Sequence, residues 1–598
     1  MQANPGGLCP VPRLSWQGHT PRGLDLYHQA EHGLAESEHV YLLGNDLPRR
    51  FADCTGRFTL AEVGFGAGLN FLASVRLWRQ RAPTSASLRY IAFEPMPLAG
   101  SQLAYALAPF AELAAFTERL LAIYPPLLVN SFTLRFAEDI ELELHFFPLQ
   151  ESARPFVADA WFYDAFAPAR DPAAWNARAM QTVASTSRPG TSIATFSVAA
   201  AARKGLEVQG FAVRRAEGYG EKRHMLRGKF QGKERVAGAG AMESGMRIAI
   251  IGGGLAGCAL AASLAELMKL TDADGGPTAS ITLFERRAAL AERASRHRHA
   301  VLFAKVPWLA DWRQRWLWRC WCESYSYFTL FPDLFTRLPK ILLPGGKRGA
   351  NWLAGWRRTW SARAHGDWLA FDTPSGGLCL PRAGLLDMQR LAKMLAAGAA
   401  ERGVAIRTGA WVRNIALGLV EFRQDGSHRR ESFTHLAFCA NGGVASLLAL
   451  EGLHCYKGQV NRLEVSGPLR QIYGSGAGYI APAGEGMAEC GGEFLKDFAN
   501  LRARAGQGEG IRRALAADFG APDEQFGGRA RQTGAWADLR STGRDHLPLV
   551  GLLRNGLYLN CGYGGKGSLA ITPTSRMLAA AMQGDAGSFP EELRPTRF

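Results

Sequence analysis

Residues 58–78 read FTLAEVGFGAGLNFLASVRLW, and residues 246–267 read MRIAIIGGGLAGCALAASLAEL. Both stretches run from an apolar segment of strand length, through a glycine-rich turn, into a pattern typical of a helix. Glycine tolerates positive φ and leaves room for a ligand beside the backbone. The two stretches therefore predict two α/β domains with mainly parallel sheets, each with a ligand site where a strand ends.

A linker separates the two turns. Residues 228–245 read GKFQGKERVAGAGAMESG, which is polar, rich in glycine and alanine, and without an apolar period. A chain of 598 residues is also too long for a single hydrophobic core. We expect a first domain at residues 1–228, a linker at 229–245 and a second domain at 246–598.

The bulk composition narrows the class of protein. A formal net charge of +16 favours a polyanionic partner such as nucleic acid, with general solubility as the alternative. The ten cysteines include no CxxC pair and no Cys/His cluster at zinc spacing, so we expect reduced thiols and no metal. No apolar run reaches the roughly 18 residues of a membrane span, and the first residues lack the features of a secretory signal. We expect a cytoplasmic monomer that is not bound to a membrane.

Acidic side chains follow the strands around the first turn. Glu62 comes just before the glycines, and Glu94 ends the strand IAFE, where a carboxylate can accept hydrogen bonds from two ribose hydroxyls. Asp164 follows the apolar strand DAWFY. The glycines alone are compatible with a tight turn that binds nothing, but acids at three strand ends favour a ligand site. The candidate residues are Glu62, Gly64, Gly66, Gly68, Asn70, Glu94 and Asp164.

The second turn has the spacing of a dinucleotide-binding motif. Gly252, Gly254 and Gly257 form GxGxxG directly after an apolar strand, where the helix N-terminus can donate N–H groups to a diphosphate. Glu285 ends the next strand, ITLFE, in position to bind ribose hydroxyls. The motif alone leaves nicotinamide and flavin cofactors open.

The first half resembles the methyltransferase half of the bifunctional tRNA 5-methylaminomethyl-2-thiouridine biosynthesis proteins. The resemblance spans nearly all of residues 20–228 and implies a class I (Rossmann-like) fold that binds S-adenosylmethionine, with Asp164 beside the acceptor amine. This chain has Pro148-Leu149-Gln150 where that family carries a Gly-Asp pair, so the resemblance assigns no contact to the adenine. It rests on AEVGFGAGLNF (61–71), YLLGNDLPRRF (41–51), DAWFYDAFAPARDPAAW (159–175), RPGTSIATFSVAAAARKGL (188–206) and GFAVRRAEGYGEKRHML (210–226).

The second half resembles the oxidoreductase half of the same family, and the glycine-oxidase/D-amino-acid-oxidase family. The resemblance implies an FAD-binding Rossmann domain with an inserted α+β substrate domain. Arg540 or Arg544 would hold a substrate carboxylate through a bidentate pair. Lys566 lies in a second glycine turn that meets the flavin and is counted with the catalytic candidates. The implied cofactor contacts are Gly252, Gly254, Gly257, Glu285, Ser295, Gly564, Gly565 and Gly567. The matching stretches are 375–391, 438–442, 456–463, 541–551 and 564–567.

One loop departs from that family. Residues 293–300 read RASRHRHA where the family has Gly-Ala-Ser-Gly-Asn and then a Gly, so only Ala294 and Ser295 persist. The larger side chains either crowd the flavin ring or belong to a repositioned loop that still binds FAD. No carboxylate or cysteine is spaced to complete a metal site with His297 and His299, which favours a loop without metal.

Together the two halves imply a reaction sequence on a tRNA wobble uridine. FAD-dependent oxidation of a carboxymethylaminomethyl arm, followed by hydrolysis, would leave a primary amine and glyoxylate. The methyltransferase would then methylate that amine. The alternatives are a fused small-molecule amine oxidase and methyltransferase, or an active methyltransferase whose degenerate flavin domain binds RNA.

A cluster of tryptophans leaves two interpretations open. Nine of the fifteen tryptophans lie between residues 308 and 368. Trp308, Trp312 and Trp316 follow a helical spacing, with arginines interleaved at 313, 315 and 319 and a similar composition at 356–360. The pattern predicts either a helix with a buried aromatic face or a basic surface that stacks unpaired bases.

Overall fold

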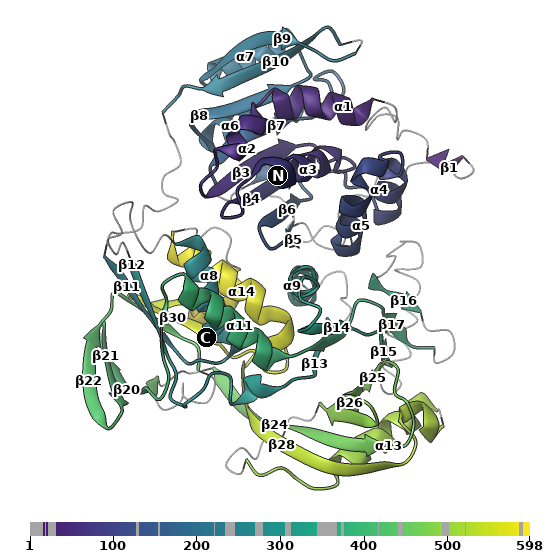
Figure 1. Ribbon diagram of the computed structural model, residues 1–598, viewed down its shortest axis with the longest axis vertical. Helices are drawn as coiled ribbons and strands as arrows, with labels where there is room; N and C mark the ends of the chain where they lie inside the picture. The colour runs from purple at the N-terminus through teal and green to yellow at the C-terminus, as the bar shows by residue number, and fades with distance from the viewer. Residues whose placement is uncertain are drawn as a thin grey trace. The chain divides into compact units, whose positions relative to one another are not determined.

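The protein divides into two compact units, seen in the computed structural model in Figure 1. The first comprises Met1–Ala239 with Lys305–Leu330, and the second Gly240–Ala304 with Phe331–Phe598. Among the described residues, no helix is both long and apolar enough to cross a bilayer. The structure describes residues 16–17, 20–21, 32–126, 131–152, 156–220, 222–233, 245–268, 279–304, 312–343, 368–371, 376–416, 418–440, 447–448, 450, 452–492, 495, 501–520, 522–584 and 590–597.

An eight-stranded sheet forms the first unit, in the order β5-β6-β4-β3-β7-β8-β10-β9. The five strands β6, β4, β3, β7 and β8 run parallel, while β5 and β10 are antiparallel to their neighbours. The strand order reverses between β3 and β7, the place where ligands bind in open α/β sheets. The strands are β3 (Arg57–Val63), β4 (Ser87–Phe93), β5 (Ser131–Ala137), β6 (Ile140–His145), β7 (Ala158–Tyr163), β8 (Ser187–Thr195), β9 (Phe211–Glu217) and β10 (His224–Phe230).

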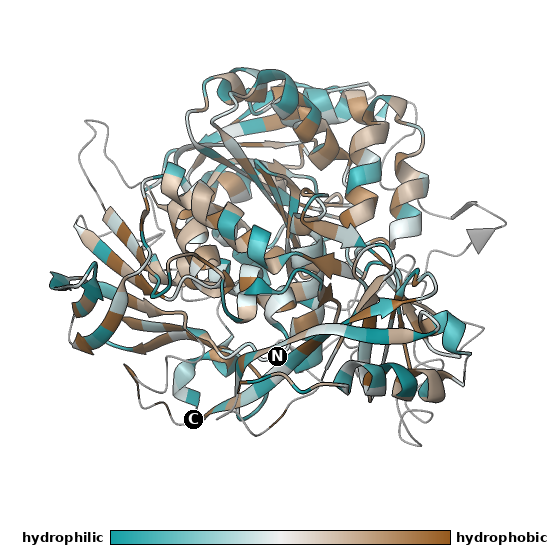
Figure 2. Cartoon of the chain, turned by 60° about the horizontal axis from the view of Figure 1, so that its bottom comes forward, coloured by the Kyte–Doolittle hydropathy of each residue, from teal (hydrophilic) through white to brown (hydrophobic). Residues whose placement is uncertain are grey.

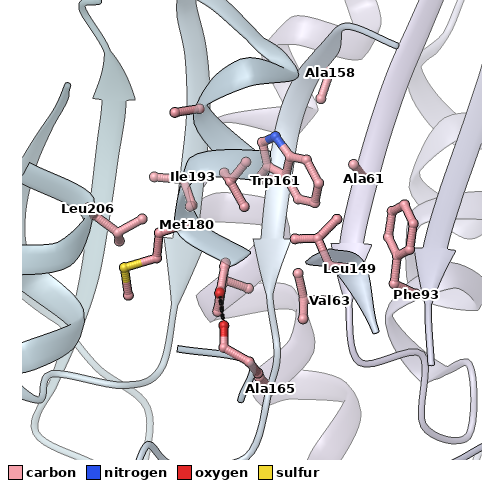
Figure 3. Packing of buried hydrophobic residues seen from close by; sticks show 14 of the residues in the cluster. Ala61, Val63, Phe93, Leu149, Ala158, Trp161, Ala165, Met180, Ile193 and Leu206 are labelled. Atoms are coloured by element: carbon pink, nitrogen blue, oxygen red, sulfur yellow. Dashed lines mark hydrogen bonds between the residues drawn. The ribbon is translucent and has the colours of Figure 1, made fainter. Parts of the chain in front are cut away.

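Helices cover both faces of this sheet. On one face Trp161 of β7 lies at the centre of a buried cluster with Met180 of α6 (Ala177–Ser185) and Leu206 of α7 (Ala200–Val208), as Figure 3 shows. On the other face Phe71 of α3 (Leu69–Arg81) meets Tyr90 of β4 edge to face, with ring centroids 5.0 Å apart. Because side chains alternate along a strand, Val63 joins the first face and Glu62 points to α3. The remaining helices are α1 (Gly33–Ser37), the π-helix η2 (Glu38–Leu43), α2 (Leu47–Ala52), α4 (Gly100–Leu107) and α5 (Ala114–Ile123).

Helix α9 (Trp312–Phe328) comes from the second half of the sequence and packs within the first unit. Its Glu323 carboxylate accepts a hydrogen bond from the Thr133 N–H at 2.9 Å, and its Ser326 hydroxyl accepts one from the Arg135 N–H at 3.0 Å. Both N–H groups belong to β5, the edge strand of the sheet. Without α9 they would be unpaired and open to hydrogen bonding with a strand of another molecule. Residues 305–330 are therefore an exception to the expected domain boundaries, because the helix is stabilised by the first sheet.

The same helix decides between the two interpretations of the tryptophan cluster as far as it is described. Trp316, Trp318 and Trp321 are buried. Arg319 forms an ion pair with Glu323 at 2.7 Å. These contacts favour the helix with a buried aromatic face. Trp308 and the arginine-tryptophan stretch at 356–360 lie outside the described residues.

A six-stranded sheet forms the core of the second unit, in the order β19-β12-β11-β23-β30-β29. Five strands are parallel, and β29 is antiparallel to β30. Helix α8 (Leu255–Leu267) contacts both α11 (Met388–Glu401) and α14 (Gly567–Met582). A three-stranded sheet packs its Phe422 against Phe284 of β12, with ring centroids 5.0 Å apart. The strands are β11 (Met246–Ile251), β12 (Ala279–Phe284), β19 (Ala405–Arg407), β23 (His435–Phe438), β29 (Leu549–Arg554) and β30 (Leu557–Cys561), and in the small sheet β20 (Trp411–Ala416), β21 (Leu419–Gln424) and β22 (Ser427–Ser432).

The rest of the second unit is a separate α+β part, which agrees with the predicted fold class. Its eight-stranded sheet has the order β16-β17-β15-β25-β26-β27-β24-β28, and α13 (Gln507–Phe519) packs on it through Ile511 and Leu515. Figure 2 shows that the helices of the protein carry both hydrophobic and hydrophilic residues along their length. The long strands β24 (Leu453–Val465) and β28 (Ala530–Gly543) pair along their whole length. The other strands are β15 (Lys340–Leu342), β16 (Ala370–Phe371), β17 (Leu378–Leu380), β25 (Ile472–Ser475), β26 (Gly478–Pro482) and β27 (Met487–Gly491), with β13 (Ala300–Leu302), β14 (Phe335–Arg337) and β18 (Gly384–Leu386) in a further small sheet.

Two candidate active sites

The first glycine turn requires glycine for steric reasons. Gly64 has φ +90°, and a Cβ atom there would lie 2.4 Å from the carbonyl oxygen of Asp164. Gly68 has φ +81°, and a Cβ atom would lie 2.8 Å from the ring of Phe65. The turn thus lets the end of β3 lie directly against the residue that follows β7. Side chains that are about a hundred positions apart in the sequence meet at this point.

Glu94 anchors the turn from the end of β4. Its carboxylate accepts hydrogen bonds from the N–H groups of Gly66 and Met96, both at 2.9 Å. Burial raises the pKa of Glu94, while these two backbone hydrogen bonds act to lower it. The carboxylate therefore holds the turn in shape and lines the cavity beside it.

A network of buried carboxylates surrounds Asn70. The Asn70 amide donates to Glu62 Oε1 at 2.8 Å and to Asp164 Oδ2 at 2.7 Å, which places these two acids on either side of one side chain. The Tyr90 hydroxyl donates to Glu62 Oε2 at 2.8 Å. Burial and the charge of Asp164 raise the pKa of Glu62 well above its ordinary value. Burial raises the pKa of Asp164 to about 6, although hydrogen bonds from Tyr41 and Asn70 act to lower it.

Tyr41, Asn70, Glu94 and Asp164 line a cavity of about 970 Å³. That volume is in the upper range of ligand pockets and suits two ligands side by side. One wall carries Pro148, Leu149 and Gln150, the segment to which the sequence assigned no contact, and another carries Phe196 and Tyr219. Buried acids with raised pKa values gain stabilisation from a cationic ligand. The sulfonium and ammonium groups of S-adenosylmethionine are such a ligand, so the residues present fit it.

The second glycine turn has the same backbone plan. Gly252 has φ +114°, and a Cβ atom at Gly257 would lie 1.9 Å from the carbonyl oxygen of Gly252. A Cβ atom at Gly254 would meet only the Ser295 hydroxyl, at 3.2 Å, so this face of the turn is open. The Glu285 carboxylate accepts from the N–H groups of Gly253 and Arg287, both at 2.8 Å. An open turn at the N-terminus of α8 fits the diphosphate of a dinucleotide such as FAD.

The closing glycine turn packs on the end of β28. The Gly564 N–H donates to the Ser541 carbonyl and the Lys566 amino group to the His546 carbonyl, both at 2.7 Å. Gly564 has φ +56°, and Gly567 begins α14 after Gly565. The lysine that the sequence marked as catalytic thus ties two turns together through its amino group.

The two arginine candidates lie in different surroundings. Arg540 is partly buried on β28. A Cβ atom added to Gly458 would lie 2.3 Å from the Arg540 Nε, so the guanidinium lies close against the Gly458 backbone. Burial lowers the pKa of Arg540, against the opposing effect of Tyr479 and Asp538. Arg544 is exposed in the turn that follows β28. Of the two, Arg540 has the surroundings in which an ion pair with a carboxylate is weakly screened.

Acidic residues on the eight-stranded sheet of the second unit hold the unusual loop. Arg293 pairs with Asp538 at 2.6 Å. His297 and His299 lie 3.3 Å and 3.1 Å from the two carboxylate oxygens of Glu489. The arrangement favours the repositioned loop, because Arg293, His297 and His299 have acidic partners on strands β27 and β28. Ser295, which persists from the family pattern, accepts a hydrogen bond from the Leu255 N–H at 2.9 Å at the start of α8.

Sequence reasoning missed the partners of these candidates. Glu489 and Asp538 carry no motif, and strand alternation does not say which loop they face. Tyr41 lies in a stretch quoted only for its family resemblance, and nothing in the local pattern indicates that its hydroxyl reaches Asp164. Within the described residues, no group of three or more histidine, cysteine or acidic side chains has an arrangement that could hold a metal ion.

Comparison with known families gives two matches along the chain. Residues 111–231 match the S-adenosyl-L-methionine-dependent methyltransferase family, and residues 247–581 match the FAD dependent oxidoreductase family. The first match begins after the first glycine turn, and the second includes the GxGxxG turn and the closing glycine turn.

Similarity to bacterial relatives extends over almost the whole chain. The tRNA 5-methylaminomethyl-2-thiouridine biosynthesis bifunctional protein MnmC of Pseudomonas aeruginosa is 31% identical over 96% of this chain and 95% of its own length. The protein of the same name from Chromobacterium violaceum is 29% identical over 98% and 97%. That of Magnetococcus marinus is 28% identical over 96% and 93%.

Solved structures resemble part of the chain at low identity. Glycine oxidase from Geobacillus kaustophilus is 18% identical, covering 59% of this chain and 99% of its own, with a TM-score of 0.48. L-proline dehydrogenase from P. horikoshii is 15% identical, covering 60% and 98%, with a TM-score of 0.48.

Proposed function

The chain belongs to the family of bifunctional tRNA 5-methylaminomethyl-2-thiouridine biosynthesis proteins, and we propose that it completes the side chain of the tRNA wobble uridine in two steps. The FAD-dependent oxidoreductase unit removes the carboxymethyl group from 5-carboxymethylaminomethyl-(2-thio)uridine. The S-adenosylmethionine-dependent unit then methylates the aminomethyl nitrogen. The single observation that carries the proposal is Asp164, a carboxylate in the wall of a large cavity and in contact with the first glycine turn.

When bound, S-adenosylmethionine supplies a methyl group on a sulfonium and FAD supplies a hydride acceptor. Around the first, the chain has to hold the donor and present the amine in line with the methyl carbon and sulfur. Glu94 is placed to accept hydrogen bonds from ribose hydroxyls, and Gln150 offers an amide on the wall beside it. The proposed donor-binding residues are Glu62, Gly64, Gly66, Gly68, Asn70 and Glu94.

Asp164 has the properties of a base for the amine. A primary ammonium must lose a proton before its nitrogen can attack, and Asp164 takes up that proton when it is ionised. Burial raises its pKa to about 6, so at neutral pH the group is ionised and still basic enough to bind a proton. Phe196 and Tyr219 line the same cavity and offer aromatic faces on which an unpaired base can stack. We propose that they receive the wobble base.

In the second unit the proposed cofactor contacts surround the two glycine turns. The N–H groups at the start of α8 and the Ser295 hydroxyl face the diphosphate of FAD. Glu285 faces its ribose. Arg540 holds the carboxylate of the substrate arm by charge, with Arg544 and Lys566 at the neighbouring turns. The proposed FAD-binding residues are Gly252, Gly254, Gly257, Glu285, Ser295, Gly564, Gly565 and Gly567.

The net charge of +16 supports tRNA as the partner over a small amine, because a small substrate gives no reason for a strongly positive protein. A monomeric state, a cytoplasmic location and the absence of a bound metal are part of the same proposal.

The test uses the full-length protein and tRNA from cells that stop at the carboxymethylaminomethyl stage. Without S-adenosylmethionine, we expect the aminomethyl nucleoside and glyoxylate; with it, the methylaminomethyl nucleoside. Nucleosides are identified by mass spectrometry, and bound flavin by its absorption at roughly 450 nm. Flavin-loaded protein that leaves the tRNA unchanged would contradict the proposal, and methylation without oxidation would restrict it to the first unit.

A further inference from the structure

Tyr41 is the second side chain that holds Asp164. Its hydroxyl donates a hydrogen bond to Asp164 Oδ1 at 2.5 Å, while the Asn70 amide donates to Oδ2 at 2.7 Å. Tyr41 is 3% exposed, so water does not compete freely for this hydrogen bond. Each carboxylate oxygen has about two lone-pair sites, which leaves one site on each oxygen for a substrate.

The surrounding structure fixes the tyrosine in this position. Tyr41 lies in η2, a π-helical segment, where the wider turn changes the direction of a side chain relative to an α-helix. Its ring packs against Phe162, with centroids 5.3 Å apart, and its carbonyl oxygen accepts from the Asn45 amide at 2.9 Å. Because the backbone and the ring are both held, the hydroxyl has one well-defined partner.

Several charged groups determine the protonation of Asp164. Burial is the largest influence and raises its pKa to about 6, while the hydrogen bonds from Tyr41 and Asn70 lower it. Glu36 of α1 acts to raise this pKa, and Lys222 of the β9–β10 turn acts to lower it. Glu36 and Lys222 pair with each other at 2.6 Å. Tyr41 is thus one of few groups that keep the carboxylate ionised near neutral pH. The other acidic residues near Asp164 are Glu62, Glu94 and Asp171.

We propose that Tyr41 is a positioning residue for N-methylation, which holds Asp164 as an oriented carboxylate facing the amine. This inference rests on the proposed function. The ammonium gives a proton to Asp164, and the freed nitrogen lone pair forms a bond to the methyl carbon. The carbon–sulfur bond breaks as its electron pair passes to sulfur. Tyr41 exchanges no proton with the substrate; its hydroxyl stabilises the ionised form of the base.

The test is the pH dependence of methylation by the full-length Tyr41→Phe variant, with tRNA that carries the aminomethyl nucleoside. Loss of the hydroxyl should raise the pKa of Asp164 by about one unit, since a hydrogen bond to a carboxylate contributes roughly that much. The acid limb of the kcat profile should move up by about one pH unit. Near pH 6 the rate should fall about fivefold, and the loss should approach tenfold at lower pH. The rate should recover above pH 8, with unchanged affinity for S-adenosylmethionine.

Tyr124→Phe is the matched control. Tyr124 is also a buried tyrosine of the first unit, and its hydroxyl donates to the Leu98 carbonyl at 2.9 Å, away from Asp164. Its loss should lower stability without moving the pH profile. Coincident profiles for Tyr41→Phe and the parent would overturn the proposal, and so would a uniform loss of rate at every pH.

A second measurement separates this proposal from the reaction itself. A double-mutant cycle of Tyr41→Phe and Asp164→Asn, read out by thermal unfolding, needs no substrate. We expect the two changes to be coupled at pH 8, where Asp164 is ionised, and the coupling to weaken at pH 5. Coupling without methylation of tRNA would contradict the proposed function alone. Additive changes at both pH values would contradict the role of Tyr41.

Discussion

In both units a glutamate at the end of the second strand accepts hydrogen bonds from two N–H groups. One belongs to the glycine turn and the other to the residue two positions after the glutamate itself. The Glu94 carboxylate accepts from the N–H groups of Gly66 and Met96. The Glu285 carboxylate accepts from those of Gly253 and Arg287. The backbones of the two sites are therefore built alike, and the side chains around them are not.

The first site gathers acids and the second gathers bases. Asp164 and Glu62 flank Asn70 in the first, with pKa values raised by burial. In the second, the loop that supplies Ser295 carries arginine and histidine side chains, with acidic partners on a neighbouring sheet. This difference matches the charges of the proposed ligands, a sulfonium in one case and a diphosphate in the other. We therefore propose that the shared turn provides the shape of a site and that the flanking side chains select the ligand.

The largest effect expected is that of Asp164→Asn. The variant keeps the size and shape of the side chain, but an NH2 group replaces one of the two accepting oxygens and the side chain cannot take up a proton. Methylation should fall about 10²–10⁴-fold, the usual contribution of a general base. In the parent, the rate should fall as the pH drops through about 6, where Asp164 becomes protonated. The measurement is the rate of methyl transfer at saturating S-adenosylmethionine, with tRNA oxidation as the control that should not change. A variant that methylates at the parental rate would show that Asp164 does not act as the base.

Gly254→Val tests the second turn. A branched side chain on the open face beside Ser295 would occupy the approach of the diphosphate. Overpacking of this kind costs about 1–3 kcal/mol, or about 5–150-fold in FAD affinity. Flavin absorbance of the purified protein reports the loss. Gly510→Ala is the matched control, because a Cβ atom there has no neighbour within 4 Å. Full flavin content in Gly254→Val would mean that the turn does not contact the cofactor.

Separation of the two halves tests the place of α9. A fragment of residues 1–239 lacks Glu323 and Ser326, so the N–H groups of β5 lose their partners. We expect association of this fragment through β5 and a loss of about 2 kcal/mol in the free energy of unfolding. Size-exclusion chromatography and calorimetry measure both. A second fragment, in which a short linker joins residues 305–330 to residues 1–239, should be monomeric and regain the lost free energy of unfolding. Equal association and stability of the two fragments would argue against the contact between α9 and β5.

Glu489→Gln should have the smallest effect. Burial acts to raise the pKa of Glu489, but His297 and His299 together lower it to about 2. A folded pKa below the ordinary value of about 4.3 stabilises the protein above pH 4.3, and this contribution is lost as the pH falls toward 2. We expect the variant to lose about 1–2 kcal/mol at pH 7 and to approach the parent in acid.

Thermal unfolding of the second unit measures this difference. Glu464→Gln is the control, since its pair with Arg531 is exposed and should contribute about 0–1 kcal/mol. Equal melting temperatures of parent and Glu489→Gln at pH 7 would mean that the loop does not depend on this pair.

Local sequence was enough to predict the two turns, the acids at the ends of their strands and the α/β class. A strand, a glycine turn and a helix are consecutive in the chain, so their pattern is visible without knowing the fold. Gly64 and Gly257 belong to this group, because their close contacts follow from the turn itself. The resemblance extended the prediction to cofactors and substrate, and the similarity to bacterial relatives over almost the whole chain agrees with it.

Tertiary structure alone decided which distant side chains meet. Tyr41 reaches Asp164 across 123 positions, and Arg293 reaches Asp538 across 245. Helix α9 covers the edge strand of a sheet whose other strands all precede residue 231. No local pattern contains such pairings, because strand alternation and helical period say which face is buried but not what lies against it. The turns therefore follow from the order of residues along the chain, whereas the charge around each turn depends on how the sheets and helices pack.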